Sequence, residues 1–253
     1  MTSPAAATSP VDKSGDRVRK MFGEIAPRYD LLNHLLSGNV DRYWRWRTTR
    51  IVPPRLANSD SPVAGAPILD LCTGTGDLAI AYDKAAGGKL AITAADFCPE
   101  MLAIGEVKGA KQGRNDRIDW VEADANKLQF EDDTYQLVTA AFGLRNVSDT
   151  DAGLREMTRV TKPGGKVAVL EFTTPRSQPM KGFYGWYFRN VLPRIGQTVM
   201  RNNTAAYEYL PESVGQFDEY EQLTERMEAA GLTNVEYKPF TFGIATLYLG
   251  EKA

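Results

Sequence analysis

The chain has 253 residues, long enough for one domain with a substantial core, and its 30 basic and 32 acidic side chains leave a formal charge of −2. That balance argues against nucleic-acid binding, and two cysteines cannot supply the disulfide framework of a small secreted protein. No apolar run of about 18 residues could span a bilayer, and the N-terminus lacks the apolar core of a signal peptide. We therefore expect a cytoplasmic protein with a small-molecule partner, for which any membrane contact is peripheral.

The N-terminal end predicts a tail followed by helices. Residues 1–15 are rich in Ala, Ser, Thr and Pro and have few large apolar side chains, so we expect a disordered tail. From Asp16 onward apolar residues recur at helical spacing. Pro27 ends this first helix, and a second helix begins near Tyr29. We expect residues 16–253 to form a single domain.

The next segment, Arg42–Arg50, combines two tryptophans with four arginines and has two interpretations. In one, it is a helix that packs on the core while its arginines stay in water. In the other, residues 16–58 form a helical lid over the active site. The sequence alone leaves both interpretations open.

The stretch Ile68–Leu78 joins an apolar strand to a glycine turn and the start of a helix. Gly74 and Gly76 form the turn, where the backbone can come close to a ligand. With Ala79 in the third place, the pattern matches the nucleotide-binding fingerprint G-x-G-x-x-G/A, and Asp96 follows twenty residues after Gly76. The stretch predicts a nucleotide-binding fold without identifying the nucleotide.

Acidic residues narrow the choice of ligand. In a dinucleotide site the pyrophosphate lies on a helix N-terminus, where the carboxylate of Asp77 would repel it. Asp70 adds a second acid, so the turn suits a ligand with an ammonium or sulfonium group. S-adenosylmethionine carries both groups, together with a ribose diol for Asp96. We predict S-adenosylmethionine binding at the strand end and turn, and an NAD-dependent oxidoreductase is the alternative that the fingerprint leaves open.

Strands and helices then alternate as in an α/β protein with a Rossmann-like, mostly parallel sheet. The predicted strands are Ile68–Cys72, Leu90–Ala95, Ile118–Glu122, Leu137–Ala141 and Lys166–Phe172. The predicted helices are Leu78–Ala86, Pro99–Val107, Thr150–Val160 and Glu219–Ala230, and Val235–Phe242 and Ile244–Leu249 are expected to pair as an antiparallel C-terminal hairpin. Ligands of such sheets bind beyond the C-terminal ends of the strands, here at Thr73–Gly76, Asp96, Asp124–Ala125 and Phe142–Asn146.

Residues 175–211 are unusually long and aromatic for a connection. Their aromatic side chains are Phe183, Tyr184, Trp186, Tyr187 and Phe188, followed by Val191, Leu192 and Ile195. They either form ordinary core or make a helical insertion that covers an apolar substrate and touches a lipid surface.

Five segments resemble the ubiquinone/menaquinone-biosynthesis C-methyltransferases, and the likeness extends over about residues 18–249. They are VRKMFGEIAPRYDLLNHLLS (Val18–Ser37), LDLCTGTGDLA (Leu69–Ala79), FGLRNVSD (Phe142–Asp149), EMTRVTKPGGKVAVLEF (Glu156–Phe172) and LPRIGQ (Leu192–Gln197). The resemblance implies a class I S-adenosylmethionine-dependent methyltransferase without a metal, which methylates a ring carbon of a prenylated quinol such as demethylmenaquinol. The substrate could also be the equivalent ubiquinone precursor, or both precursors. A homodimer and contact with the inner face of the membrane are compatible with the resemblance. A catalytically silent scaffold is a further alternative.

The same resemblance implies roles for single residues. Thr75, Asp96 and the pair Asp124–Ala125 would contact the cofactor, while Arg145, Asn146 and Tyr29 would face the substrate ring. At two positions the chain departs from the family pattern, which often has a serine at Ala141 and a histidine at Asp41.

Methylation of a ring carbon requires phenolate charge to be stabilised and a ring proton to be removed. Arg145 has too high a pKa to act as an ordinary base, so we expect it to stabilise the oxyanion. A water held by Arg145, Asn146 and Tyr29 would accept the proton. The single histidine, His34, is expected to be packed structure.

Overall fold

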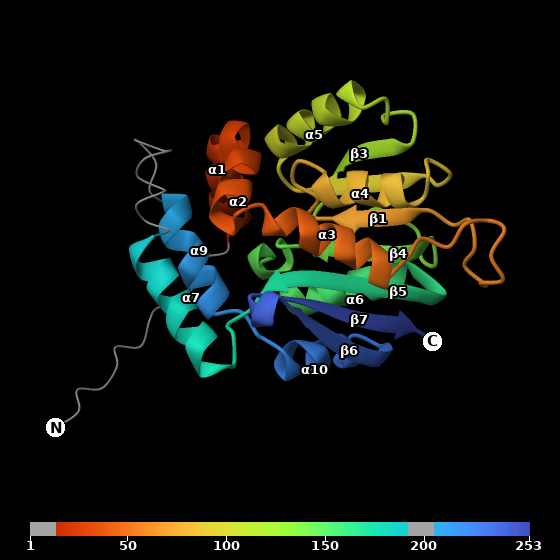
Figure 1. Cartoon of the computed structure of the whole chain (residues 1–253). Helices are drawn as coiled ribbons and strands as arrows, with labels where there is room; N and C mark the ends of the chain where they lie inside the picture. Colours follow the sequence, from red (N-terminus) through yellow and green to blue (C-terminus); the bar gives the residue numbers. More distant parts are fainter. Residues whose placement is uncertain (1–13, 192–204) are drawn as a thin grey trace.

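The structure, a computed structural model, describes residues 14–191 and 205–253 and contains a seven-stranded sheet of order β3-β2-β1-β4-β5-β7-β6 (Figure 1). The strands are β1 (Ile68–Leu71), β2 (Ile92–Asp96), β3 (Ile118–Glu122), β4 (Tyr135–Ala141), β5 (Thr161–Phe172), β6 (Leu232–Phe240) and β7 (Ala245–Lys252). Strands β1 to β5 pair in parallel, and β7 is antiparallel to both β5 and β6. The predicted parallel sheet with an antiparallel C-terminal hairpin is confirmed.

Helices cover both faces of the sheet. They are α1 (Gly15–Ile25), α2 (Tyr29–Ser37), α3 (Val40–Ile51), α4 (Asp77–Ala85), α5 (Pro99–Lys111), α6 (Thr150–Val160), α7 (Gln178–Asn190), α9 (Ala205–Gly215) and α10 (Glu221–Ala229), with short 3-10 turns η1 (Ala26–Arg28), η2 (Leu144–Asn146) and η3 (Thr241–Gly243). One core packs α6 and α10 against the sheet, and another packs α3 and α4. The first helix begins at Gly15, inside the predicted tail, whose first 13 residues lie outside the described ranges.

The central strand β1 is buried along its whole length because its neighbours cover both edges and helices cover both faces. Leu71, its last residue, stands level with Ala95 of β2 and Ala140 of β4. The C-terminal ends of these parallel strands therefore meet at one edge of the sheet. This register brings the segments after β1, β2 and β4 together.

Strand β5 begins at Thr161 rather than at the predicted Lys166. Thr161 lies opposite Tyr135, but Lys166 lies opposite Leu137, so the residues between them form a bulge. Gly164 in this bulge has φ +77°, a conformation that glycine adopts without strain. The glycines of this segment are visible in the sequence and are typical of a turn. Whether the segment becomes part of a strand depends on its pairing with β4.

Helices α1 and α2 stand beside α7 and α9 at one end of the molecule (Figure 1). The Tyr187 hydroxyl of α7 donates a hydrogen bond to the Leu36 carbonyl of α2 at 2.7 Å. The two expected covering segments, residues 16–58 and 175–211, therefore meet. Leu192, Ile195 and the LPRIGQ segment lie outside the described residues, as do the side chains of Phe183 and Phe188.

Helix α3 fits the packed-helix interpretation of the aromatic and basic segment except at one arginine. Trp44 is buried in the core, and its indole N–H donates to the Thr241 hydroxyl at 2.7 Å. Arg42, Arg47 and Arg50 are exposed, as the packed-helix interpretation predicts. Arg45 is buried instead, so the expectation that all four arginines stay in water is wrong for this one.

Candidate active site

A cavity of about 230 Å³ lies at the C-terminal ends of β1, β2 and β4. Its lining includes Gly74 after β1, Asp96 at the end of β2, and Asp124 and Ala125 after β3, all of which were predicted to contact the cofactor. Parallel sheets bind ligands at this edge, and the register of the strands explains why these residues converge. We call this space the cofactor cavity.

Asp96 forms part of its polar wall. Its Oδ2 accepts a hydrogen bond from the Gly74 N–H at 2.7 Å, and its Oδ1 accepts one from the Cys98 N–H at 2.9 Å. Burial raises the pKa of this carboxyl, while the backbone donors oppose that effect. The carboxylate is thereby held in one orientation beside the glycine turn, where its remaining lone pairs suit a diol.

Asp70 lies beneath the turn and does not line the cofactor cavity. Its carboxylate accepts hydrogen bonds from the Thr73 hydroxyl at 2.6 Å, the Thr139 hydroxyl at 2.9 Å and the Ala79 N–H at 3.0 Å. Burial raises the pKa of Asp70 to about 6, against the effect of these donors. Its position favours a role in holding the turn between β1 and α4.

Thr75 and Asp77 also point away from the cofactor cavity. The ammonium of Lys108 lies 3.0 Å from the Thr75 hydroxyl, 2.7 Å from Asp77 and 2.7 Å from Asp30 of α2. Burial alone would raise the pKa of Asp77, but Arg45 and Lys108 hold it below its usual range. The inference that Asp77 makes the ligand pocket acidic is therefore wrong, because its charge is compensated outside that cavity.

Gly76 packs against the side chain of Trp120 and does not line the cofactor cavity. A Cβ atom built on it would lie 2.3 Å from the indole ring of Trp120, and its φ of +79° is a conformation that L residues rarely adopt. The second glycine of the fingerprint is thus required for packing on β3 and for the turn.

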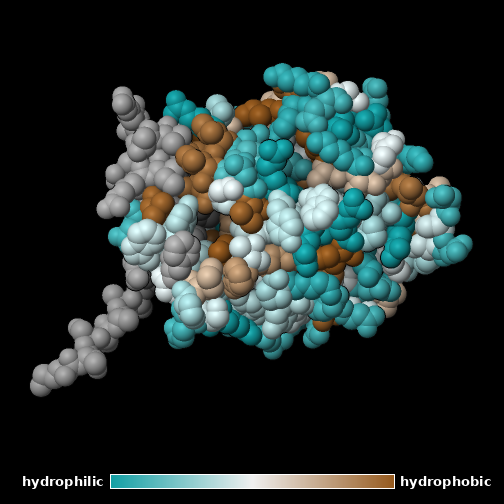
Figure 2. Space-filling model, in the orientation of Figure 1, coloured by the Kyte–Doolittle hydropathy of each residue, from teal (hydrophilic) through white to brown (hydrophobic). Residues whose placement is uncertain are grey.

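A second, more apolar cavity of about 450 Å³ lies between the N-terminal helices and α7 and α9. Its apolar lining includes Met21, Phe22, Ile25, Leu32, Leu35, Leu36, Val40, Trp44, Phe142, Phe172 and Ile244. Figure 2 shows hydrophobic side chains gathered around a hollow at this end of the molecule. Phe22, Tyr29 and Phe142 line both cavities, so the two spaces share a wall. We call this second space the apolar cavity.

Arg145 lines the apolar cavity and is 6% exposed. Its Nη1 donates to Glu171 Oε2 at 3.0 Å and also to the carbonyl of Phe142. Its Nε is buried and has no hydrogen-bond partner within the described ranges. Glu171, at the end of β5 and 1% exposed, thus orients a guanidinium that keeps a donor free for a ligand.

Asn146 lines the cofactor cavity, and Tyr29 stands in the wall that both cavities share. The Tyr209 hydroxyl of α9 donates to Asn146 Oδ1 at 3.0 Å, which fixes that amide. Burial raises the pKa of Tyr29, while a hydrogen bond with Asn33 and the charges of Arg145 and Arg45 lower it. The structure thus places the three predicted substrate-facing residues around the wall between the two cavities.

Comparison with known proteins identifies the family. Residues 11–252 match the sequence model of the ubiE/COQ5 methyltransferase family. The chain belongs to this family. A Geobacter sulfurreducens relative named ubiquinone/menaquinone biosynthesis C-methyltransferase UbiE is 43% identical over 240 residues, 95% of this chain and 90% of that protein. A Chlorobaculum tepidum demethylmenaquinone methyltransferase is 42% identical over 240 residues, 95% of this chain and 94% of that protein.

Solved structures share the fold at low sequence identity. A SAM-dependent methyltransferase from Aquifex aeolicus superposes with a TM-score of 0.59 at 17% identity, over 83% of this chain and 89% of that one. The [4+2]-cyclase SpnF reaches 0.67 at 18% identity, over 97% and 99% of the two chains. These likenesses confirm the class I fold. The family membership confirms the resemblance seen in the sequence.

Asp41, one of the departures from the family pattern, is part of a charged cluster. His34 Nδ1 lies 2.9 Å from Asp41 Oδ2, and the Ser37 hydroxyl donates to Asp41 Oδ1 at 2.6 Å. Arg45 forms an ion pair with the same carboxylate. Burial would raise the pKa of Asp41, but Ser37, Arg45 and His34 together lower it, so the carboxylate stays ionised at neutral pH. His34 is therefore more than packed structure, because it stabilises a buried acid.

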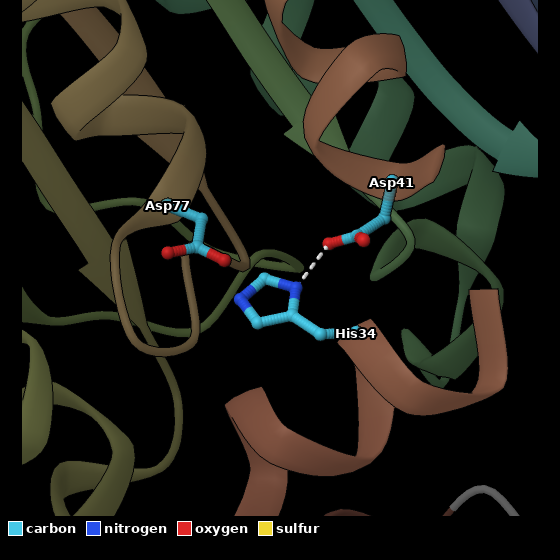
Figure 3. Close-up of side chains that lie close together, drawn as sticks. All are labelled: His34, Asp41 and Asp77. Atoms are coloured by element: carbon cyan, nitrogen blue, oxygen red, sulfur yellow. Dashed lines mark hydrogen bonds and ion pairs between the residues drawn. The ribbon is translucent and has the colours of Figure 1, made fainter. Parts of the chain in front are cut away.

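Figure 3 shows His34, Asp41 and Asp77 converging from α2, α3 and α4. Their ligand atoms lie within 4.8 Å of one another, a spacing compatible with a metal ion. However, Arg45 Nη1 is bonded to Asp41 and lies 3.7 Å from Asp77. A cationic side chain already compensates these carboxylates, so the cluster does not indicate a metal site.

Sequence reasoning missed Glu171, Arg45 and Tyr209. Glu171 carried one usable signal, because an acid at the end of an apolar strand at the ligand edge of the sheet needs a partner. Arg45 looked the same as the exposed arginines around it. Tyr209 lies in the long connection, where nothing local indicates that its hydroxyl reaches Asn146.

Proposed function

We propose that this member of the ubiE/COQ5 family transfers a methyl group from S-adenosyl-L-methionine to a ring carbon of a prenylated quinol, converting demethylmenaquinol to menaquinol. The observation that carries the proposal is the pair of adjoining cavities, one at the ligand edge of the sheet with Asp96 in its wall and one larger and more apolar, with Tyr29 in their common wall. The names of the Geobacter and Chlorobaculum relatives support it. The equivalent step in ubiquinone biosynthesis, alone or in addition, is the alternative.

The residues of the cofactor cavity fit S-adenosylmethionine. Asp96 offers a fixed carboxylate for the ribose diol, Gly74 allows close approach of the backbone, and Asp124 and Ala125 stand on the same wall. Asp70, Thr75 and Gly76 would act by holding the turn. When bound, the sulfonium supplies an electrophilic methyl group, and the apolar cavity next to it excludes water from the transfer.

The substrate ring would lie against the shared wall, with its prenyl tail in the apolar cavity. Arg145 presents its unpartnered Nε to the hydroxyl next to the methylated carbon and stabilises the charge that develops there. Glu171 keeps the guanidinium in place. A water held by Arg145, Asn146 and Tyr29 accepts the ring proton.

Labelled S-adenosylmethionine tests the function directly. We expect label to appear in menaquinol when the protein is supplied with demethylmenaquinol in detergent. Label only in the product of the demethyl ubiquinol precursor would assign the enzyme to ubiquinone biosynthesis. Label in both products would mean that one enzyme serves both pathways. No transfer to either acceptor, with cofactor bound, would refute the proposal and favour a silent scaffold. Reduction of added NAD would favour an oxidoreductase.

Peripheral contact with the inner face of the membrane is part of the proposal. In the described ranges, every helix is too short or too polar to cross a bilayer. The outer face of α3 instead exposes Arg42, Tyr43, Trp46, Arg47 and Arg50, which share one arc of the helix. Aromatic rings and arginines without an acid between them suit an anionic lipid surface. The inner face of the same helix lines the apolar cavity.

Flotation with vesicles tests this contact. Replacing Arg42, Arg47 and Arg50 together with glutamine should weaken binding to vesicles containing phosphatidylglycerol on the order of a hundredfold, because each arginine contributes about fivefold near such a surface. Neutral vesicles are the control. Unchanged binding would refute the assignment to α3, and loss of binding only after deletion of residues 183–188 would assign it to the helical insertion.

A further inference from the structure

The apolar cavity contains a second buried arginine that the proposed mechanism does not use. Arg45 of α3 is 8% exposed and lines the same cavity as Arg145. Its Cζ lies 5.6 Å from the ring centroid of Phe142, and the Cζ of Arg145 lies 5.5 Å from that of Phe172. The two rings are themselves 4.4 Å apart. Both guanidiniums thus belong to one aromatic wall.

The two arginines are anchored in the same way. Arg145 uses Nη1 for its bonds to Glu171 and to the Phe142 carbonyl. Arg45 also uses Nη1, toward Asp41 and Asp77. In the part of the chain that the structure describes, the remaining N–H groups of both guanidiniums make no hydrogen bond. Each arginine therefore keeps donors that a ligand in the cavity can use.

Tyr29 lines the apolar cavity together with Arg45 and Arg145. Its hydroxyl stands in the shared wall, and the charges of Arg145 and Arg45 both oppose the increase in its pKa caused by burial. Each of the two guanidiniums is held by carboxylates at Nη1, so its other N–H groups can each donate to an oxygen of a ligand in the cavity. The cavity therefore suits a ring with two separated oxygen atoms.

We propose that Arg45 binds the second oxygen of the substrate ring, the hydroxyl next to the prenyl-bearing carbon. This inference rests on the proposed function, in which Arg145 takes the hydroxyl next to the methylated carbon. The ring would then be held at both oxygens, with the methylated carbon facing Tyr29 and the cofactor cavity. Arg45 acts here as a specificity residue for 1,4-dihydroxy rings.

The charged cluster around Arg45 explains how such a residue is held. Asp41 and Asp77 compensate its charge from α3 and α4, and His34 in turn contacts Asp41 at 2.9 Å. These residues hold the guanidinium through Nη1 and leave its other donors for the ligand. Asp41 and His34 are thus positioning residues, and the Arg45–Asp77 ion pair connects α3 to the first turn of α4.

The proposal is tested by removing the second hydroxyl from the substrate and, separately, the guanidinium from residue 45, and by comparing all four combinations. The probes are demethylmenaquinol with a short prenyl tail and the matching 3-prenyl-1-naphthol, which lacks only the second hydroxyl. With the unaltered protein, kcat/KM should fall roughly ten- to a hundredfold on removal of that hydroxyl, the usual value of a hydrogen bond to a charged group. In Arg45→Gln the two probes should be methylated at rates within about twofold of each other.

Matched variants separate recognition from structure. Any general damage in Arg45→Gln lowers the rates with both probes and cancels in their ratio. Arg45→Lys should preserve part of the discrimination, and Arg55→Gln, which removes an exposed arginine, should preserve all of it. Equal rates with both probes in the unaltered protein, or full discrimination in Arg45→Gln, would overturn the assignment. Failure to methylate either probe would instead refute the proposed function.

Discussion

Replacing Arg145 with alanine is expected to lower kcat by about a hundredfold or more and to reduce the free energy of unfolding by about 3–5 kcal/mol. The first effect comes from the loss of the donor that stabilises the oxyanion. The second follows because Glu171, 1% exposed, would remain as a buried charge without its ion-pair partner. Turnover, cofactor affinity and urea unfolding measure the two effects separately.

A double variant distinguishes catalysis from stability. Arg145→Ala combined with Glu171→Gln removes both charges, so most of the lost stability should return while turnover stays low. If Arg145→Ala retains near-normal turnover while it binds cofactor, Arg145 does not stabilise the oxyanion. If the double variant recovers activity together with stability, the role of Arg145 is structural.

Replacing Gly76 with alanine is expected to destabilise the protein by about 2–4 kcal/mol and to abolish cofactor binding at physiological temperature. The added Cβ would lie 2.3 Å from the Trp120 ring, at a φ of +79°. Either Trp120 or the glycine turn must move, and movement of the turn displaces Gly74 from the cofactor cavity. Thermal unfolding with and without S-adenosylmethionine measures both effects.

Gly87 supplies the matched control. It also has a positive φ, +62°, but nothing lies within 4 Å of a Cβ built on it. Gly87→Ala should therefore lower the free energy of unfolding by only about 1 kcal/mol and leave cofactor binding intact. In Gly76→Ala, shortening Trp120 to leucine should restore part of the stability. Equal effects of the two glycine substitutions would show that backbone strain, and not packing on Trp120, decides the result.

The cofactor cavity could largely be predicted because its residues are tied to strand ends. Gly74, Asp96 and Asp124 each follow an apolar run, and parallel pairing brings such ends to one edge whatever side chains surround them. The direction of a side chain within the turn could not be predicted in this way. Asp77 belongs to the same turn, yet its carboxylate faces Lys108 and Arg45.

The succession of strands and helices along the chain, the nucleotide turn and the family resemblance could be predicted from the sequence. These depend on local periodicity, turn residues and motifs that the chain carries in short segments. Three features became visible only in the folded structure: the pairing of Arg145 with Glu171, the bond from Tyr209 to Asn146 and the burial of Arg45. The first two join residues 26 and 63 positions apart, so they form only when helices and strands pack. The physical reason is that a charge is buried only where the fold supplies its partner, and the partner of Arg145 lies 26 positions away in the chain.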